Sequence, residues 1–482
     1  MATNDFTDWA ERNWGQSQLG DKRRNARAVQ LGAALAAHPD ASLPAQTGNW
    51  SDLKAAYRLL AEPEVTHEAL IQPHRETIYR QASQSEGVVL FIQDTTELDY
   101  SSHKQTTELG HIGDSKGMGL LVHSCLAVIP NESSPELLGL AAQAVWTREA
   151  TIRRGNETRT ERAKRRTEPD IWAETVEKIG SPPVAQASPV AQASQGQEIT
   201  RWVSVGDRGS DVFSYVQRVR ALGWHCLVRV CQDRVIQKSD SIERERLMNC
   251  LRNLPSFACK QVNLRGRDGL PQRSVTLQIT WQSAAVCPPR LRTGAVNPDP
   301  PISGCYIRCW EERKEEDDSP SEPLEWLLFT TVPVENETSA CQALDWYSCR
   351  WLIEEYHKCL KTGCSMERRQ LRSGASLMTL LGFLSLVGLR LLWLRSLSRE
   401  YPDRPASSAV PRSWLALLLA RHRGKNTSIE DMSLSLFWRE IARLGGFIGR
   451  KSDGGPGWQT LWRGWFRFQD MLWAASWARA TQ

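Results

Sequence analysis

The sequence lacks several features that would assign the protein to a class at once. Its twelve cysteines include no CxxC pair and no nearby paired histidines, and Cys305 and Cys309 have a poor spacing for zinc. We therefore expect reduced, mostly buried thiols in a cytosolic protein. The N-terminal stretch is polar and acidic and has no signal-peptide core.

Long hydrophobic runs and a strong net charge are also missing. The longest apolar run, Leu377 to Leu389, is too short to span a membrane and is ended by Arg390, so it predicts a buried helix and no membrane partner. With 60 Lys plus Arg against 55 Asp plus Glu, the net charge is +5. Any affinity for nucleic acid must therefore come from local patches. The 482 residues allow about two to four domains.

One stretch, YSCRWLIEEYHKCLK at residues 347–361, gathers polar groups on one face. On an α-helix of about 100° per residue, six side chains fall within an arc of roughly 100°. These are Tyr347, Arg350, Glu354, His357, Lys358 and Lys361. A solvated face with an i,i+4 ion pair is one interpretation. A metal-bound carboxylate flanked by phosphate-binding groups is the other, because one acid stands among several cations. Residues 339–342 (SACQ) fit a capping box at the start of this helix.

Two further acids lie on strand-like runs. GVVLFIQDTTELDY, residues 87–100, indicates a buried strand that carries Asp94, and a buried carboxylate is costly unless it is paired or binds metal. Hydrogen bonds from threonine hydroxyls and the backbone are the alternative for Asp94. ITRWVSVGD places Asp207 just past a strand, where open α/β sheets put their chemistry. Asp211 stands where a helix N-cap is expected.

The flanking regions differ in character. Residues 1 to about 70 are helical in pattern, and a basic cluster in LGDKRRNAR fits either a solvated helix face or a DNA-binding surface. The cluster consists of Lys22, Arg23, Arg24 and Arg27. Residues 232 to 335 are β-rich, with a hairpin predicted from CKQVNLRG and RSVTLQITW.

The spacing of Tyr347, Arg350, Glu354 and Lys361 resembles the YREK signature of DDE transposases of the bacterial insertion-sequence-four family. IQDTT around Asp94 also matches this family, and LGDKRRNAR and AAYRLL resemble its N-terminal end-recognition domain. The similarity covers essentially the whole chain.

The resemblance implies an α/β fold with an RNase H-like core, a mixed sheet flanked by helices that is interrupted by a β-rich insertion. Helical domains precede and follow the core. We expect a DNA-binding domain at 1–70, the first part of the core at 71–231, the insertion at 232–335, the second part of the core at 336–398 and a dimerisation domain at 399–482.

The resemblance also implies the activity. Asp94, Asp207 and Glu354 would be the catalytic acids and would hold two Mg²⁺ ions, for which Mn²⁺ would substitute. The enzyme would cut double-stranded DNA at the terminal inverted repeats, through a hairpin intermediate, and join the 3′-OH ends to target DNA. It would work as a homodimer in a synaptic complex, in the bacterial cytoplasm and on the nucleoid when bound to DNA.

The family pattern further assigns DNA contacts. Trp326 corresponds to a tryptophan that stacks on a flipped end base, although a buried strand aromatic is the alternative. Tyr347, Arg350 and Lys361 would hold phosphates beside the scissile bond. The secondary candidates are His357, Lys358, Arg208 and Arg229. Two other functions stay open: an RNase H-like nuclease without strand transfer, and a catalytically silent DNA-binding regulator.

Overall fold

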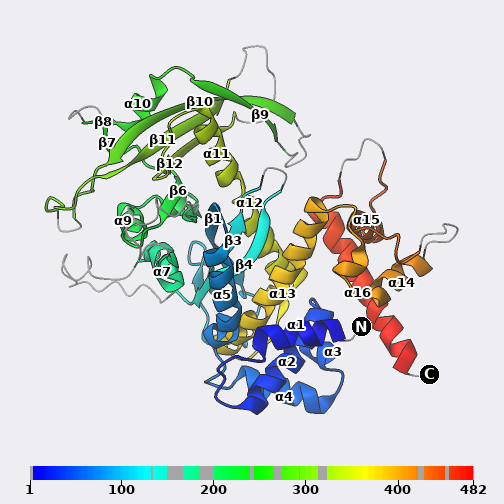
Figure 1. Cartoon of the computed structure of the whole chain (residues 1–482). Helices are drawn as coiled ribbons and strands as arrows, with labels where there is room; N and C mark the ends of the chain where they lie inside the picture. The colour runs from blue at the N-terminus through cyan, green and yellow to red at the C-terminus, as the bar shows by residue number, and fades with distance from the viewer. Residues whose placement is uncertain are drawn as a thin grey trace.

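The computed structural model has a mixed α/β fold built on one large sheet (Figure 1). It describes residues 4–131, 134–148, 167–183, 200–238, 244–264, 273–291, 294–312, 323–421, 428–450 and 455–480. Within these ranges, twelve strands join into a single hydrogen-bonded sheet. One half of the sheet belongs to the predicted core and the other half to the predicted insertion.

The core half of the sheet is a meander followed by parallel strands. Its strands are β1 (Val88–Asp99), β2 (Gly110–Ile112), β3 (Gly117–Ile129), β4 (Glu136–Trp146), β5 (Arg201–Gly206) and β6 (His225–Arg229). β3 pairs with β4 and β1 in antiparallel fashion, whereas β5 pairs in parallel with both β1 and β6. This order, β4-β3-β1-β5-β6, is consistent with the predicted RNase H-like core.

Helices cover both faces of the core sheet. Alternate residues of β1 enter two different hydrophobic clusters, because successive side chains of a strand point to opposite faces. Val89 and Phe91 pack with α7 (Asp170–Ile179) and α9 (Phe213–Ala221), while Leu90 and Ile92 face the cluster that contains the later helices. This double coverage explains why β1 reads as a continuous apolar run.

The region of the predicted insertion continues the same sheet. It contains β7 (Val235–Lys238), β8 (Arg244–Arg246), α10 (Leu247–Arg252), β9 (Ala258–Leu264), β10 (Arg273–Val286), β11 (Ile302–Glu311) and β12 (Glu325–Thr330). β9 and β10 form the predicted antiparallel hairpin, whose turn lies outside the described residues. β12 pairs with β6 of the core, with Leu328 opposite Arg229. The insertion is therefore hydrogen-bonded directly to the core.

The N-terminal region is helical, as predicted. Its helices are α1 (Asn4–Trp14), α2 (Lys22–Ala37), α3 (Leu43–Thr47), α4 (Trp50–Leu60) and α5 (His67–Gln84). The boundary predicted at residue 70 falls inside α5, so the chain has no break there. Buried Arg369 ties this region to the core, since its guanidinium donates to the carbonyl oxygens of Pro39, Ala41 and Cys364.

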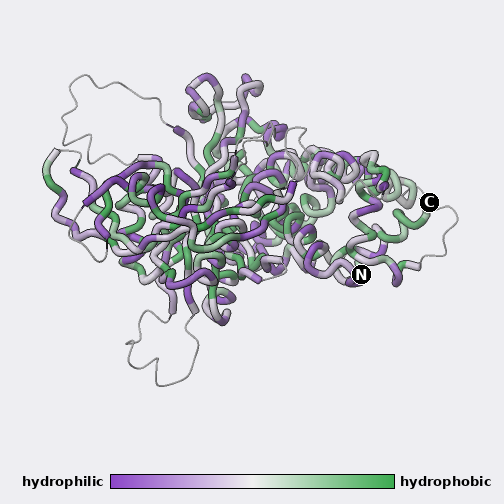
Figure 2. Tube along the Cα trace, turned by 90° about the horizontal axis from the view of Figure 1, so that it is seen from above, coloured by the Kyte–Doolittle hydropathy of each residue, from purple (hydrophilic) through white to green (hydrophobic). Residues whose placement is uncertain are grey.

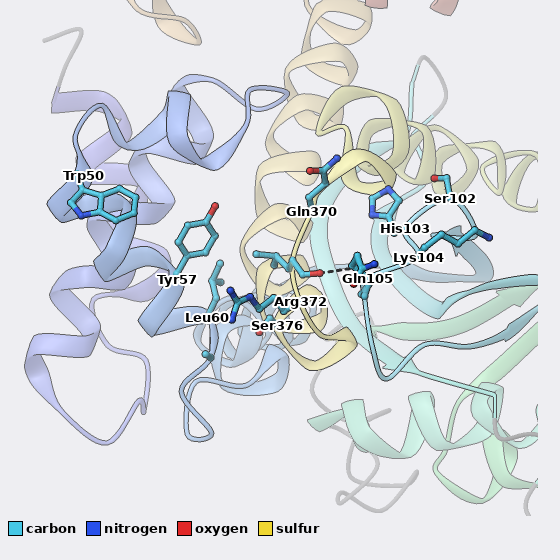
Figure 3. A pocket seen from close by; sticks show the side chains of 13 residues that line it. Trp50, Tyr57, Leu60, Ser102, His103, Lys104, Gln105, Gln370, Arg372 and Ser376 are labelled. Carbon is cyan, nitrogen blue, oxygen red and sulfur yellow. Dashed lines mark hydrogen bonds between the residues drawn. The ribbon is translucent and has the colours of Figure 1, made fainter.

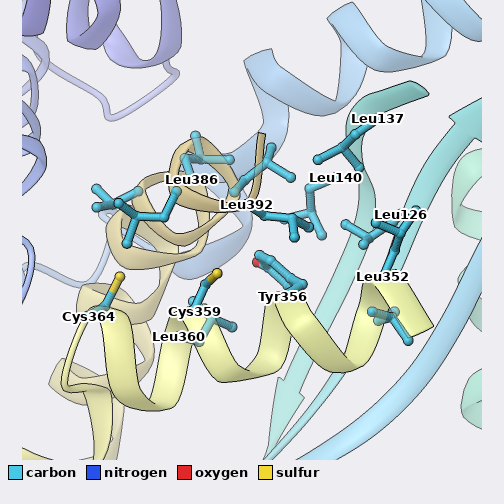
Figure 4. Close-up of a cluster of buried hydrophobic side chains, with 14 of the residues drawn as sticks. Leu126, Leu137, Leu140, Leu352, Tyr356, Cys359, Leu360, Cys364, Leu386 and Leu392 are labelled. Carbon is cyan, nitrogen blue, oxygen red and sulfur yellow. The ribbon is translucent and has the colours of Figure 1, made fainter. Parts of the chain in front are cut away.

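A helical segment follows the insertion and packs on the sheet. It comprises α11 (Glu337–Ser348), α12 (Trp351–Lys358), the π-helix η3 (Cys359–Gly363), the short 3₁₀ turn η4 (Met366–Arg368) and α13 (Gly374–Glu400). α13 is long and apolar enough to cross a membrane, but 83% of its most apolar window is buried inside the protein. This burial confirms the predicted core helix. Figure 4 shows α12 and η3 directing Leu352, Tyr356, Cys359 and Leu360 into this core.

The chain closes with the 3₁₀ turn η5 (Ala406–Ser408), α14 (Arg412–Ala420), α15 (Leu434–Leu444) and α16 (Trp458–Ala480). The two ends of the chain lie on the same side of the molecule in two perpendicular views (Figure 1 and Figure 2). Phe6 of α1 accordingly packs against Trp414 of α14, with 5.7 Å between ring centroids. The N-terminal and C-terminal helices are thus in contact.

Candidate active site

Asp94 lies within β1, near the middle of the core sheet, and pairs with Ser124 of β3. Its side chain is 19% exposed, and one carboxylate oxygen accepts the backbone N–H of Thr95 at 2.8 Å. Burial, followed by the negative charge of Asp207, raises the pKa of Asp94 to about 6. Such a carboxylate favours a cation as its partner.

Asp207 lies directly beyond β5 and next to Asp94. β1 and β5 run parallel, and the last residues paired between them are Ile92 and Val205. Both acids lie two residues beyond this pair, so the parallel register brings them to the same level of the sheet. The Asp207 carboxylate accepts the backbone N–H of Gly209 at 2.8 Å and caps the short 3₁₀ turn η2 (Arg208–Ser210).

Glu354 projects from α12 toward the same place. Its side chain is 47% exposed, and it pairs with the guanidinium of Arg350. The same guanidinium lies 3.3 Å from a carboxylate oxygen of Asp94. The negative charge of Glu354 also contributes to the raised pKa of Asp94. The three acids predicted from the sequence are therefore neighbours, with Arg350 between two of them.

The chemistry of this donor set suits a hard divalent cation. Three carboxylates offer oxygen ligands, which are the ligands that Mg²⁺ and Mn²⁺ prefer. Across the described ranges, no three acidic, histidine or cysteine side chains are already gathered closely enough to hold a metal ion. Arg350 is the cation that the carboxylates of Asp94 and Glu354 now contact.

The predicted continuous helix from Tyr347 to Lys361 is wrong. α11 ends at Ser348, a turn follows, and α12 gives way to a π-helix at Cys359. The break arises because the backbone N–H groups of Leu352 and Ile353 bond three residues back, to Cys349 and Arg350, as in a 3₁₀ turn.

Two predicted caps are also corrected. The capping box belongs to Asn336, whose side chain accepts the backbone N–H of Ser339, so the helix starts three residues earlier than SACQ suggested. Asp211 does not cap α9. It is buried, accepts the backbone N–H of Cys231 at 2.9 Å and pairs with Arg234.

Two family models match the chain. A transposase DNA-binding model matches residues 6–65, and a transposase DDE domain model matches residues 195–387. The chain carries the DNA-binding and DDE domains of a transposase. The DDE match includes Asp207 and Glu354, whereas Asp94 precedes it.

A groove of about 310 Å³ opens beside Glu354 in this transposase. Tyr347 and Trp326 meet edge to face in its wall, with 5.4 Å between ring centroids. Burial raises the pKa of Tyr347, while the nearby cations Arg350 and Arg229 lower it. Of the DNA contacts predicted from the sequence, Trp326, Arg229, Tyr347 and Arg350 thus share one groove with Glu354.

The predicted placement of His357 on the polar face is wrong. The residue is 7% exposed, and its imidazole lies 3.3 Å from the hydroxyl of Ser124 on β3. Burial, together with the charges of Lys361 and Arg350, lowers the pKa of His357 to about 3. His357 therefore packs α12 on the sheet as a neutral ring.

The remaining predicted cations are on or near the surface. Lys358 is exposed, and Lys361 is half-buried 3.5 Å from a carboxylate oxygen of Glu367. Arg208 is exposed beside Asp207. In the basic cluster of α2, Lys22, Arg23 and Arg27 are exposed, whereas Arg24 is half-buried and pairs with Glu62 and Glu64.

A second, larger groove of about 1110 Å³ lies between α4 and two loops of the core (Figure 3). The α4 wall carries Trp50 and Tyr57, which are 72% and 40% exposed. The loop wall carries Lys104 and Arg372, and the two loops are held together because the backbone N–H and the hydroxyl of Thr107 both donate to the carbonyl oxygen of Arg372. Sequence reasoning missed this groove because its walls lie far apart in the chain. The signal available in the sequence was the presence of two large aromatic residues, Trp50 and Tyr57, on the short helix α4.

Proposed function

We propose that this transposase belongs to the insertion-sequence-four family and moves its element by cut-and-paste transposition. In this proposal Tyr347, Arg350, Glu354 and Lys361 form the YREK signature. The observation that carries the proposal is the meeting of Asp94, Asp207 and Glu354 from a strand, a strand end and a helix. Three acids that converge in this way are typical of metal-assisted phosphoryl transfer.

Asp94, Asp207 and Glu354 would hold the divalent ions, with Mg²⁺ expected, Mn²⁺ as its substitute and two ions per site. Bound ions would activate the attacking oxygen and stabilise the leaving oxygen. The protein's own groups have separate tasks. Arg350 pairs with two of the acids, and its planar guanidinium also suits bidentate contact with a phosphate.

The proposed reaction has four steps. Water attacks the phosphodiester at the element boundary and leaves a 3′-OH. That hydroxyl attacks the opposite strand and closes a hairpin, which a second water reopens. The freed 3′-OH ends then attack target DNA. Tyr347, Arg350 and Lys361 would hold the phosphates beside the scissile bond, and Trp326 would stack on a displaced end base in the groove beside Glu354.

DNA would approach this site along the basic N-terminal surface and the larger groove. Exposed Lys22, Arg23 and Arg27 would contact phosphates, as would Lys104 and Arg372. Two protomers would each bind one element end in the synaptic complex. The enzyme would work in the bacterial cytoplasm.

The test is incubation of the protein with Mg²⁺ and a duplex that carries the element's own terminal repeat, resolved on a denaturing gel. Nicks and hairpins at the repeat boundary, absent with Glu354→Ala, would support the proposal. Cleavage without any joined product on a target plasmid would favour the nuclease alternative. Binding without cleavage would favour the silent regulator.

A further inference from the structure

Glu355, the residue after Glu354, has the opposite environment. Its side chain is only 5% exposed, whereas that of Glu354 is 47% exposed. Successive residues of an α-helix point about 100° apart, so the two carboxylates leave α12 on different sides. Glu355 points away from the acids of the candidate site and into the junction of three helices.

Three donors from two other helices reach the Glu355 carboxylate. Arg399, in the last turn of α13, donates to both of its oxygens at 2.9 Å. Trp458, the first residue of α16, donates its indole N–H to Oε1 at 2.5 Å. A buried carboxylate is costly without such partners, and bidentate contact with arginine fixes its orientation.

Packing around these bonds ties the same three helices together. The Arg399 guanidinium lies over the Trp351 ring, 4.8 Å from its centroid, and Trp351 opens α12. Trp458 stacks on Trp462 at 5.4 Å. The Trp462 ring approaches Gly363 of the π-helix so closely that an added Cβ at Gly363 would lie 2.5 Å from it. The start of α16 therefore contacts α12 at Glu355 and the π-helix η3 at Gly363.

We propose that Glu355 is a positioning residue that couples the C-terminal helix α16 to the angle at which α12 presents Glu354. Arg399 and Trp458 are its partners in this task. On the opposite side of α12, His357 contacts Ser124 of β3. α12 is thus held between the sheet and the C-terminal helices, and Glu354 is left exposed on the side that faces Asp94. The inference rests on the proposed function, because it assigns Glu354 to a metal-dependent site.

The test uses the full chain and separates positioning from simple stability. Glu355→Gln keeps the shape of the side chain but removes its charge and one acceptor oxygen. We expect it to slow single-turnover cleavage at saturating DNA by at least tenfold and to raise the Mg²⁺ concentration for half-maximal cleavage at least fivefold. Binding of the terminal-repeat duplex in a gel shift should change by less than twofold.

A second readout does not depend on turnover. The Mn²⁺ affinity of the DNA-bound protein is measured by the loss of the electron paramagnetic resonance signal of free Mn²⁺. This affinity should weaken at least fivefold in Glu355→Gln. Trp458→Phe removes only one donor and should shift both metal readouts about twofold to threefold, which keeps the test valid if Glu355→Gln does not fold. The matched control is Glu440→Gln, which alters another buried carboxylate that pairs with an arginine within the C-terminal helices.

The outcomes separate the two proposals. A wild-type protein that never cleaves would overturn the proposed function. The proposed role of Glu355 would be overturned if the wild type is active but Glu355→Gln and Trp458→Phe both keep its Mg²⁺ requirement and its Mn²⁺ affinity. Equal metal shifts in Glu440→Gln would also overturn it, since the effect would then follow from general loosening of the C-terminal helices.

Discussion

The guanidinium of Arg350 lies 3.3 Å from a carboxylate oxygen of Asp94, on a different element and 256 residues away in sequence. The contact puts a positive side chain where the proposed divalent ions would bind. Arg350 also pairs with Glu354, so one guanidinium holds the strand acid and the helix acid together. The acids are thus close together before any metal ion binds, but the Arg350 guanidinium already contacts Asp94 and Glu354 and would compete with the ion.

This competition predicts opposite effects of Arg350→Gln on two measurements. Without DNA, the variant should bind Mn²⁺ at least threefold more tightly than wild type by calorimetric titration, because the competing charge is gone. Cleavage should nevertheless fall by at least a hundredfold, because the phosphate loses its bidentate partner. Weaker Mn²⁺ binding in the variant would contradict the competition, and Arg252→Gln serves as a control at an exposed arginine.

Asp94→Asn should stabilise the protein while abolishing cleavage. The pKa of Asp94 is raised to about 6 in the folded chain, so its ionised form is disfavoured there relative to the unfolded chain. Stability is therefore lost as pH rises from about 4 to about 6, by up to about 3 kcal/mol. At pH 7.5 without metal, thermal unfolding of Asp94→Asn should occur at a higher temperature than that of wild type.

Addition of Mg²⁺ provides the control for this prediction. Mg²⁺ should stabilise wild type, because it binds the folded carboxylates, and should stabilise Asp94→Asn much less. If Asp94→Asn unfolds at a lower temperature than wild type in the absence of metal, the ionised Asp94 carboxylate does not destabilise the fold and the prediction is wrong.

The protein should lose stability in mild acid because it buries neutral histidines. Burial lowers the pKa of His67 to about 4 and those of His123 and His357 to about 3. The unfolded chain takes up protons below about pH 6.5 and the folded chain does not, so stability falls as pH falls through this range. At pH 5.5 each ring costs about 1.4 kcal/mol, and protonation of Asp94 offsets about 1 kcal/mol of the total.

Urea unfolding at pH 7.5 and 5.5 measures this loss. His123→Gln should reduce the difference in unfolding free energy between the two pH values by about 1.4 kcal/mol, the cost of one buried histidine, even if it lowers stability at both pH values. Parallel pH dependence in wild type and variant would refute the assignment of a neutral buried ring at this position.

The larger groove predicts separable effects of its cations and its aromatic residues on DNA binding. Lys104→Ala and Arg372→Ala should each reduce the slope of log affinity against log salt by about 0.9. Tyr57→Ala should weaken binding by about fivefold or more with little change in that slope, because stacking is less sensitive to salt. Tyr401→Ala, which removes a similarly exposed ring elsewhere, should leave binding unchanged.

Sequence patterns predicted the strands that carry Asp94 and Asp207, because strand patterning is a local signal, whereas the grouping of the three acids was expected only from the family resemblance. Asp94 and Asp207 follow buried apolar runs, and parallel pairing of those runs brings the acids together. The ideal helix over residues 347–361 failed because helical periodicity says nothing about the 3₁₀ turn at Cys349. His357 was misplaced for a related reason: its burial depends on Ser124, which lies on a strand distant in sequence.

Contacts between distant segments were beyond sequence reasoning. Glu355 looked like one more charge beside Glu354, and only its bonds to Arg399 and Trp458 distinguish it. The groove between α4 and the loops of the core depends likewise on two segments that converge only in the fold. A single sequence carries no pairing information of this kind.

The antiparallel pairing of β12 with β6 has a consequence for how DNA is bent at the candidate site. Leu328 lies opposite Arg229 in this pairing, so the predicted insertion and the core share one continuous sheet, and Trp326 lies two residues along β12 from Leu328. Moving the β7–β12 region relative to the core would have to bend or break this pairing. We therefore expect the double helix to supply the bending, so that duplexes with pliable pyrimidine–purine steps at the cut are processed faster than stiff ones.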